Sequence, residues 1–529
     1  MTLAPFRRDS PAVRSHLSGT AGLGTAVPGT APPPRAPARS GRERSPKLAA
    51  QVAQRIEADI ATAGWPVGQV FGSENDLRER YGVSRAVLRE AVRLVEHHEV
   101  AAMRRGPSGG LVVLAPDATP LTAALVIYLE YIEASVEDLL AARLLLEPLA
   151  ARLAAGRLTE AGIIRLRRAL PVEPASAGQP GGTGHDQLHL TLGQLSGNPA
   201  LNLFIDVLVQ LTDIYAESPT APGPAEVEAV NRESARAHHA LADAIIAGDE
   251  AQAEHRATRH LEAVREQMVS IAQRPITRSP RPRPGPGVGD GDRVGVGVGV
   301  GKRKLAETIA RRMIADIARI GAKTGDVVGS EPELLARLDV SRAVFREAVR
   351  ILEYHSVAEM RRGPGGGLVV AEPDPSASIE AAAIYLDYQK IGLADLRSVR
   401  GAIELGALDR VAARRDDREV ARRLGEALVL EPGTGWAEIG ERAHGLHAAI
   451  AEESGNPILA LFLRIIIGVW ARHLPAPDDA SHPGSTPDEV VEVVNRAHRP
   501  VVEAILAGDV PLARHRMNRH LSALSNWWH

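Results

Sequence analysis

The chain has 529 residues, which predicts three to five domains of ordinary size rather than one. Its 62 basic and 65 acidic side chains give a formal net charge of −3, so it is not a uniformly basic nucleic-acid coat protein, although one domain can still carry a basic face. The absence of cysteine excludes disulfides, cysteine-ligated metals and a thiol nucleophile, so any metal must be bound by His, Asp or Glu.

Fold class and location follow from where the apolar residues lie. Aromatic residues make up only 3% of the chain, whereas Ala, Leu and Arg abound, and this favours a mainly α protein packed through aliphatic side chains. The longest apolar run near the C-terminus, 458–470, contains Arg464 and is shorter than the about 20 residues of a membrane-spanning helix. No apolar segment follows the arginines near the N-terminus as in a secretory signal, so we expect a cytoplasmic protein.

The sequence contains an internal repeat. Residues 71–113 and 328–370 are identical at 29 of 43 positions, at an offset of 257. Further along, the motif SGNP recurs at 196–199 and 454–457, and AIIAGD at 244–249 recurs as AILAGD. The chain therefore consists of two copies of one unit of about 230 residues.

Composition and pattern divide the chain into six segments, of which the tail and the linker lie outside the two copies. A tail and a linker rich in Pro and Gly carry no helical periodicity, and we expect the tail to be disordered. In chain order, the predicted segments are the tail (1–45), head 1 (46–115), sensor 1 (120–273), the linker (274–303), head 2 (304–372) and sensor 2 (376–529).

Each head begins with an amphipathic helix and continues into a helix-turn-helix pattern. In head 1, Ser73 is placed to cap a helix that ends near Gly82, and Ser84 is placed to cap the next one. The second helix carries arginines at i, i+4 and i+8 on one face and Val87, Ala91 and Leu94 on the other. These arginines are Arg85, Arg89 and Arg93 in head 1, and Arg342, Arg346 and Arg350 in head 2.

Such a stripe suits a helix that enters the DNA major groove, because guanidinium groups bond guanine edges and phosphates. The alternative is a solvated face whose arginines pair with Glu90 or Glu96. Two short apolar strands then flank an Arg-Arg-Gly-Pro turn, which predicts a two-stranded wing and favours the DNA-binding interpretation.

The order SE-x-x-L, VSR-x-x-x-REA and G-x-GG-x-VV resembles the DNA-binding domain of the GntR family, in its FadR-type branch. The resemblance implies that the wing tips lie along the minor groove. Together, pattern and resemblance indicate DNA contacts from Ser84, Arg85, Arg89, Arg93, Arg104, Arg105 and Gly106, and from Ser341, Arg342, Arg346, Arg350, Arg361, Arg362 and Gly363.

Both heads depart from the family pattern around the SE pair. The family usually has Pro before this pair and Arg after it, whereas the chain has Gly72 and Asn75 in one head and Gly329 and Pro332 in the other. We therefore expect one DNA-contacting arginine to be missing from each head, with an effect on operator preference.

Three histidines recur in register in the helical sensors. They are His189, His238 and His260 in sensor 1, and His447, His498 and His520 in sensor 2. Imidazoles from separate helices that converge in a bundle core can bind Zn, Ni or a similar divalent ion. The alternative for any one of them is an ordinary buried histidine.

The sensors resemble the FCD ligand-binding domain, which usually follows a FadR-type head. In that family an Asp four residues before the first histidine completes an Asp-His-His-His metal site, but the position holds His185 in sensor 1 and Ala443 in sensor 2. His185 or Asp186 can substitute in sensor 1, whereas sensor 2 keeps three ligands unless His444 joins them. We therefore expect a metal in sensor 1 more than in sensor 2, with a metal-free polar pocket as the alternative.

An arginine lies four residues before a glutamate near the start of each sensor: Arg143 before Glu147, and Arg400 before Glu404. The resemblance implies that Arg143 and Arg400 face the ligand pocket and hold an effector carboxylate. The alternative is a surface ion pair.

These observations indicate a ligand-responsive transcription regulator and not an enzyme. We expect its partners to be double-stranded DNA and a small effector, and we expect no membrane. The two heads would form an intramolecular pseudo-dimer that reads a near-palindromic operator. Whether two chains also pair is left open. Joining two heads raises the effective concentration of the second to the order of mM for a short flexible linker. The alternatives are a constitutive DNA-bridging regulator with degenerate sensors and a His-ligated metalloenzyme, against which no H-E-x-x-H motif occurs.

Overall fold

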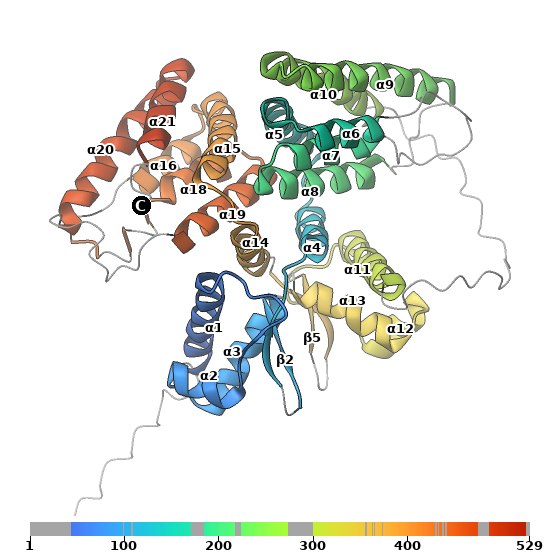
Figure 1. The fold of residues 1–529 in the computed structure, drawn as a ribbon, viewed down its shortest axis with the longest axis vertical. Helices are drawn as coiled ribbons and strands as arrows, with labels where there is room; N and C mark the ends of the chain where they lie inside the picture. Colours follow the sequence, from blue (N-terminus) through green and yellow to red (C-terminus); the bar gives the residue numbers. More distant parts are fainter. Residues whose placement is uncertain are drawn as a thin grey trace, which may run out of the picture.

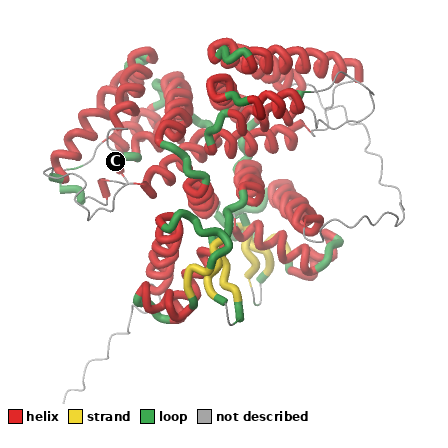
Figure 2. The backbone as a smooth tube through the Cα atoms, in the orientation of Figure 1, coloured by secondary structure: helices red, strands yellow, loops and turns green. Residues whose placement is uncertain are grey.

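The computed structural model describes residues 44–170, 185–216, 224–272, 300–473 and 486–524, except for residues 99, 107, 108, 355, 356, 362, 364, 365 and 373 and parts of 429–441. Almost all of the predicted tail and linker lies outside the described residues. The described part is mainly α, as predicted, with two small sheets (Figure 2). None of its helices combines the length and the apolar character that crossing a membrane requires.

Head 1 contains three helices and a three-stranded sheet: α1 (Arg44–Thr62), β1 (Val70–Gly72), α2 (Glu74–Tyr81), α3 (Arg85–His97), β2 (Ala101–Arg104) and β3 (Gly110–Val113). Ser73 caps α2 in a reciprocal capping box with Asp76, and Gly82 ends the helix with a φ of +63°. The antiparallel strands lie in the order β1-β3-β2, with Met103 opposite Leu111. This order makes β2 and β3 the predicted wing.

Head 2 repeats this order of elements: α11 (Val300–Ile320), β4 (Val327–Gly329), α12 (Glu331–Leu338), α13 (Arg342–Tyr354), β5 (Ala358–Arg361) and β6 (Gly367–Val370). Its sheet has the equivalent order β4-β6-β5, and Met360 lies opposite Leu368 as Met103 does opposite Leu111. Asp339 replaces Gly82 as the left-handed residue after α12, with a φ of +52°. The two heads thus share one topology and one register.

The sensors are all-helical. Sensor 1 contains α4 (Ala118–Tyr131), α5 (Val136–Arg157), α6 (Glu160–Ala169), α7 (His185–Leu195), α8 (Pro199–Ala216), α9 (Pro224–Ile246) and α10 (Glu250–Ala272). Sensor 2 contains α14 (Ser376–Tyr388), α15 (Leu393–Ala413), α16 (Arg418–Leu428), α18 (Gly445–Glu453), α19 (Pro457–His473), α20 (Pro487–Leu506) and α21 (Val510–Leu524). Figure 1 shows the sensors side by side, with both heads on the same side of the pair.

The two sensors share one apolar core. Helices α4, α5 and α8 of sensor 1 and α14, α15 and α19 of sensor 2 contribute buried residues to a single cluster. At its centre, Phe204 stacks on its counterpart Phe462 with ring centroids 4.0 Å apart. Around it, Asn198 donates to the Asp395 carbonyl at 3.0 Å and Asn456 donates to the Asp138 carbonyl at 2.9 Å, so equivalent residues make equivalent contacts from both sides.

Each head packs on the first helix of the opposite sensor. Ile384 of α14, in sensor 2, belongs to the buried core of head 1, where Trp65 makes an edge contact with Tyr388. In the same way, Ile127 of α4, in sensor 1, belongs to the buried core of head 2. The copies are therefore interlocked crosswise, which the repeat in the sequence did not reveal.

We predict that Phe462→Ala lowers the free energy of unfolding by about 3–5 kcal/mol, because it removes a fully buried ring from the core that both sensors share. Urea unfolding followed by circular dichroism measures the loss. The control Ile164→Ala, at a residue 53% exposed on α6, should cost no more than about 0.5 kcal/mol. Equal small effects in both variants would contradict a shared core.

Candidate functional site

The second helices of the two helix-turn-helix patterns, α3 and α13, present their arginines to solvent. Arg85, Arg89 and Arg93 have 62%, 64% and 75% of their side chains exposed, and Arg346 and Arg350 have 69% and 75%. On the opposite face of α3, Val87 and Ala91 are buried, and Leu94 packs against them as predicted. The sequence pattern therefore correctly separated the apolar face from the arginine face.

The exposed arginines are held by carboxylates on the preceding helix or on their own. Arg85 Nε donates to Glu74 Oε1 at 2.7 Å, and this hydrogen bond lowers the pKa of Glu74. Arg346 Nε lies 3.7 Å from Glu331 Oε1 in head 2. The Glu90 pairing considered as an alternative also occurs, because Arg93 donates to Glu90 at 3.0 Å. Such exposed pairs contribute little energy, so they do not prevent these arginines from contacting phosphates.

The two serines at the helix starts act as caps. Ser84 Oγ accepts from the Val87 backbone at 3.3 Å, and Ser341 Oγ accepts from the Val344 backbone at 3.4 Å. Capping fixes where α3 and α13 begin, and it therefore positions Arg85 and Arg342 in the first turn of each helix.

The wing tips lie in the β2–β3 and β5–β6 turns. Arg104 and Arg105 are exposed, and Gly106 and Gly363 have φ values of +119° and +105°, which glycine adopts without strain. In head 2, Arg361 donates to Glu359 at 2.6 Å, whereas Arg362 lies outside the described residues.

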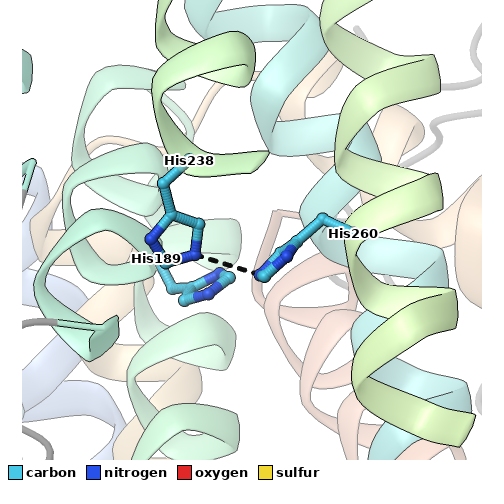
Figure 3. A group of neighbouring side chains, drawn as sticks. All are labelled: His189, His238 and His260. Carbon is cyan, nitrogen blue, oxygen red and sulfur yellow. Dashed lines mark hydrogen bonds between the residues drawn. The ribbon is translucent and has the colours of Figure 1, made fainter. Parts of the chain in front are cut away.

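In sensor 1 the three predicted histidines converge in the helical core, one each from α7, α9 and α10 (Figure 3). His189, His238 and His260 are all buried, and one ring nitrogen of each lies within 4.8 Å of the other two. The Nε2 atoms of His238 and His260 are 3.0 Å apart.

Sensor 2 repeats the arrangement with His447 from α18, His498 from α20 and His520 from α21. His520 Nε2 lies 3.0 Å from His447 Nε2 and 3.2 Å from His498 Nε2. The spacing predicted from sequence therefore identified two matched histidine triads.

The triads fit a divalent metal. A neutral imidazole binds a metal through its deprotonated nitrogen, and ligands at about 2.0–2.1 Å from one ion bring their nitrogens close together. Burial lowers the pKa of His498 to about 2 and that of His520 to about 3, and the neighbouring His447 adds to both effects. His498 and His520 are therefore neutral at pH 7, as metal ligands must be, and the spacing of the ring nitrogens in either triad suits a divalent ion.

A buried glutamate holds the first histidine of each triad. His189 Nδ1 lies 2.5 Å from Glu147 Oε2, and His447 Nδ1 lies 2.5 Å from Glu404 Oε2. Burial by itself would raise the pKa of Glu147, but Arg143 and His189 beside it lower it below its usual range. A carboxylate that accepts from Nδ1–H leaves Nε2 free to bind a metal, which is the usual support for a metal-bound histidine.

Sequence reasoning missed this role of the glutamates. The fixed spacing of each glutamate from an arginine was the signal in the sequence that could have indicated this role. The alternative of a surface ion pair is wrong, because the side chains of Arg143 and Arg400 are only 3% and 2% exposed. Each arginine donates from Nε to its glutamate at 2.5 Å in the core. The pair therefore supports the histidine site from inside the bundle.

The fourth ligand position differs between the sensors. His185 and Asp186 form the first turn of α7, but their side chains lie outside the described residues. In sensor 2, Ala443 precedes α18, and His444 does not join the triad within 4.8 Å. Burial, together with the positive charge of Arg400, lowers the pKa of His444 to about 3.

We predict that the metal-free chain loses stability as the pH falls from 7 to 5, in part through His498. Its folded pKa is depressed below the ordinary 6.5, so only the unfolded chain gains a proton there in this range, at a cost of about 2 kcal/mol by pH 5. His498→Gln should flatten the profile of unfolding free energy by that amount in the presence of a chelator. His515→Gln, at an exposed position, is the control, and parallel profiles for His498→Gln and wild type would contradict the prediction.

Comparison with known proteins gives matches to two family models. A model of bacterial regulatory proteins of the gntR family matches residues 48–109, and a model of the FCD domain matches residues 138–263 and 395–523. The gntR match thus covers head 1, and the FCD matches cover most of both sensors.

Individual relatives are distant. The chain is 28% identical over 165 residues to the Uxu operon regulator of Haemophilus influenzae, covering 31% of this chain and 57% of that protein, so it spans little more than half of that relative. It is 26% identical over 234 residues to the transcriptional repressor NanR of Escherichia coli, covering 43% of this chain and 86% of NanR. Among solved structures, a Streptococcus agalactiae GntR protein is 22% identical with a TM-score of 0.28, covering 41% of this chain and 99% of that one.

These matches exclude the metalloenzyme alternative, because the family consists of transcription regulators. The match to NanR covers most of that protein but less than half of this chain, in agreement with the internal repeat. The chain belongs to the GntR family of bacterial regulatory proteins, as a DNA-binding transcription regulator in which the FCD domain occurs twice.

Proposed function

We propose that one chain reads a near-palindromic operator with its two heads and that its sensors respond to a small carboxylate effector. The observation that carries this proposal is the exposure of matched arginine stripes on two heads, each held by the sensor pair through an equivalent contact. A protein with one head per chain needs two chains to read a two-fold operator, whereas this chain holds two heads.

In this proposal the recognition helices α3 and α13 lie in successive major grooves. Arg85 and Arg342, in the first turns, contact base edges, and the arginines one and two turns later contact phosphates. The wing arginines then follow the neighbouring minor groove. Identical residues at these positions in both heads favour two similar half-sites.

The sensors couple to the heads through α4 and α14. Each of these helices contributes both to the shared sensor core and to the core of the opposite head. An effector that binds one arrangement of the sensors more tightly than another therefore changes the angle between the heads.

Each histidine triad would hold a divalent ion such as Zn or Ni, and in a sensor that admits an effector the positive charge of the ion would attract its carboxylate. His185 or Asp186 would supply a fourth ligand in sensor 1, where we expect tighter binding. Glu147 and Glu404 keep the first histidine of each triad oriented toward the ion.

We predict that Arg85→Ala and Arg342→Ala each weaken operator binding by about 1–3 kcal/mol, because each removes a base contact from one head. The operator is first selected from random duplexes with the full chain, and affinity is then measured by fluorescence anisotropy at fixed salt. Arg165→Ala, at an exposed arginine on α6, should bind as wild type. Full affinity in Arg342→Ala together with a loss in Arg85→Ala would show that head 2 does not read DNA.

We also predict two Zn²⁺ sites per chain by calorimetric titration. His260→Gln should abolish one site and His520→Gln the other, and Glu147→Gln should weaken the sensor 1 site about 10- to 100-fold through the loss of the Nδ1 partner of His189. Glu254→Gln, at an exposed position on α10, is the matched control. Unchanged zinc binding in both histidine variants would refute the triads as metal sites.

A further inference from the structure

The two sensors surround their matched arginines differently. In sensor 1, Arg143 is closed off: Nε donates to Glu147, and Nη1 donates to Thr212 of α8 at 3.0 Å. The Arg143 guanidinium is thus bound on two sides by groups of the chain itself. Both arginines are almost fully buried, with 3% of the Arg143 side chain and 2% of the Arg400 side chain exposed, so the two sites differ in their partners and not in their burial.

In sensor 2, the position of Thr212 is taken by Trp470 of α19, whose ring centre lies 5.3 Å from the guanidinium carbon of Arg400. Nε of Arg400 still donates to Glu404, but Nη1 and Nη2 have no hydrogen-bond partner among the residues that the structure describes. Both nitrogens are buried. A buried charged donor without a partner is costly, and an anionic ligand would remove that cost.

A cavity of about 330 Å³ lies against this arginine, between α15, α19 and α21. Its size is that of a site for a small organic molecule. Trp470 and Arg400 line it together with Ala394, Arg397, Ser398, Gly401, Asn518, Leu521 and Ser522.

Substitutions between the copies favour an open site only in sensor 2. Gly401 corresponds to Leu144 of sensor 1, and a Cβ atom added at Gly401 would meet nothing within 4 Å. Ser522 corresponds to Glu262, so sensor 1 has a carboxylate where an anion would approach the sensor 2 cavity. Both changes make sensor 1 less suited to an anionic ligand.

We infer that sensor 2 holds the effector site of this chain and that sensor 1 has become a closed, structural copy. The ligand is a small carboxylate with a flat or apolar part: the carboxylate binds Arg400 Nη1 and Nη2, and the apolar part packs on Trp470. This inference rests on the proposed function and refines it, since it assigns one effector to each chain rather than two.

The test uses the full chain labelled with 5-fluorotryptophan, whose five tryptophans give separable ¹⁹F signals. Trp470→Phe identifies the signal of Trp470. The probes are benzoate and hexanoate, each compared with its neutral amide. We expect a carboxylate probe to shift the Trp470 signal saturably, the amides to leave it in place, and calorimetry to give one site per chain.

Two variants test whether the ligand binds in this cavity, because each introduces the residue that sensor 1 has at the same position. Gly401→Leu should weaken binding about tenfold or more by filling the cavity, whereas Gly425→Leu, at an exposed glycine of α16, should bind as wild type. Ser522→Glu should also weaken binding through charge repulsion, whereas Ala523→Glu beside it should not. Ser522→Glu, at an exposed position, keeps the test valid if Gly401→Leu fails to fold.

Three results would overturn the inference: an unmoved Trp470 signal with both carboxylates, two equal sites per chain, or wild-type binding in Gly401→Leu and Ser522→Glu. Operator binding is measured on the same preparations. If the chain binds its operator but the Trp470 signal does not move, the effector assignment fails alone; if it selects no operator, the proposed function fails.

Discussion

The apolar core shared by the two sensors is the contact on which the rest of the molecule depends. Phe204 and Phe462 are fully buried and stacked on each other, and each comes from the equivalent helix of one copy. Neither sensor could bury this apolar surface alone, so each sensor must pack against the other. Because the residues are equivalent, the contact also imposes a near two-fold relation on everything attached to the sensors.

The crosswise packing of the heads extends this relation to the DNA-reading surfaces. Helices α4 and α14 enter the shared core on one side and the opposite head on the other. The two junctions are chemically unequal, however. In head 1 the buried Glu57 contacts His98 at 2.6 Å and lies 3.9 Å from Arg472 of sensor 2, whereas Ile314 takes the equivalent position in head 2. A buried ionic group without complete partners is less stabilising than apolar packing, so the junctions differ in how firmly they hold.

The features that could be predicted from the sequence are those whose residues recur in both copies. The recognition helices, the wings and the histidine triads follow from local patterns that occur twice, and the structure brings the histidines together as their register required. The sequence could not show that Glu147 lies behind His189, because that contact joins residues 42 apart on different helices. It also gave no sign of the crosswise heads, since a long linker permits either arrangement.

Differences between the copies held more information than their likeness. Thr212 against Trp470 and Leu144 against Gly401 are ordinary substitutions in an alignment of the two halves, and neither has a periodicity or a motif. Their meaning depends on the nearby guanidinium groups, which the structure places beside them. A duplicated chain can relax one copy of a site while the other keeps its ligand, provided that the shared core keeps both in place.

The stoichiometry of the complex with DNA tests the central claim most directly. Native mass spectrometry of the full chain bound to its selected operator counts the chains on each duplex. A pseudo-symmetric chain with two working heads predicts one chain per operator that contains two half-sites. Two chains on every such operator, with no complex of one chain at any concentration, would contradict the account.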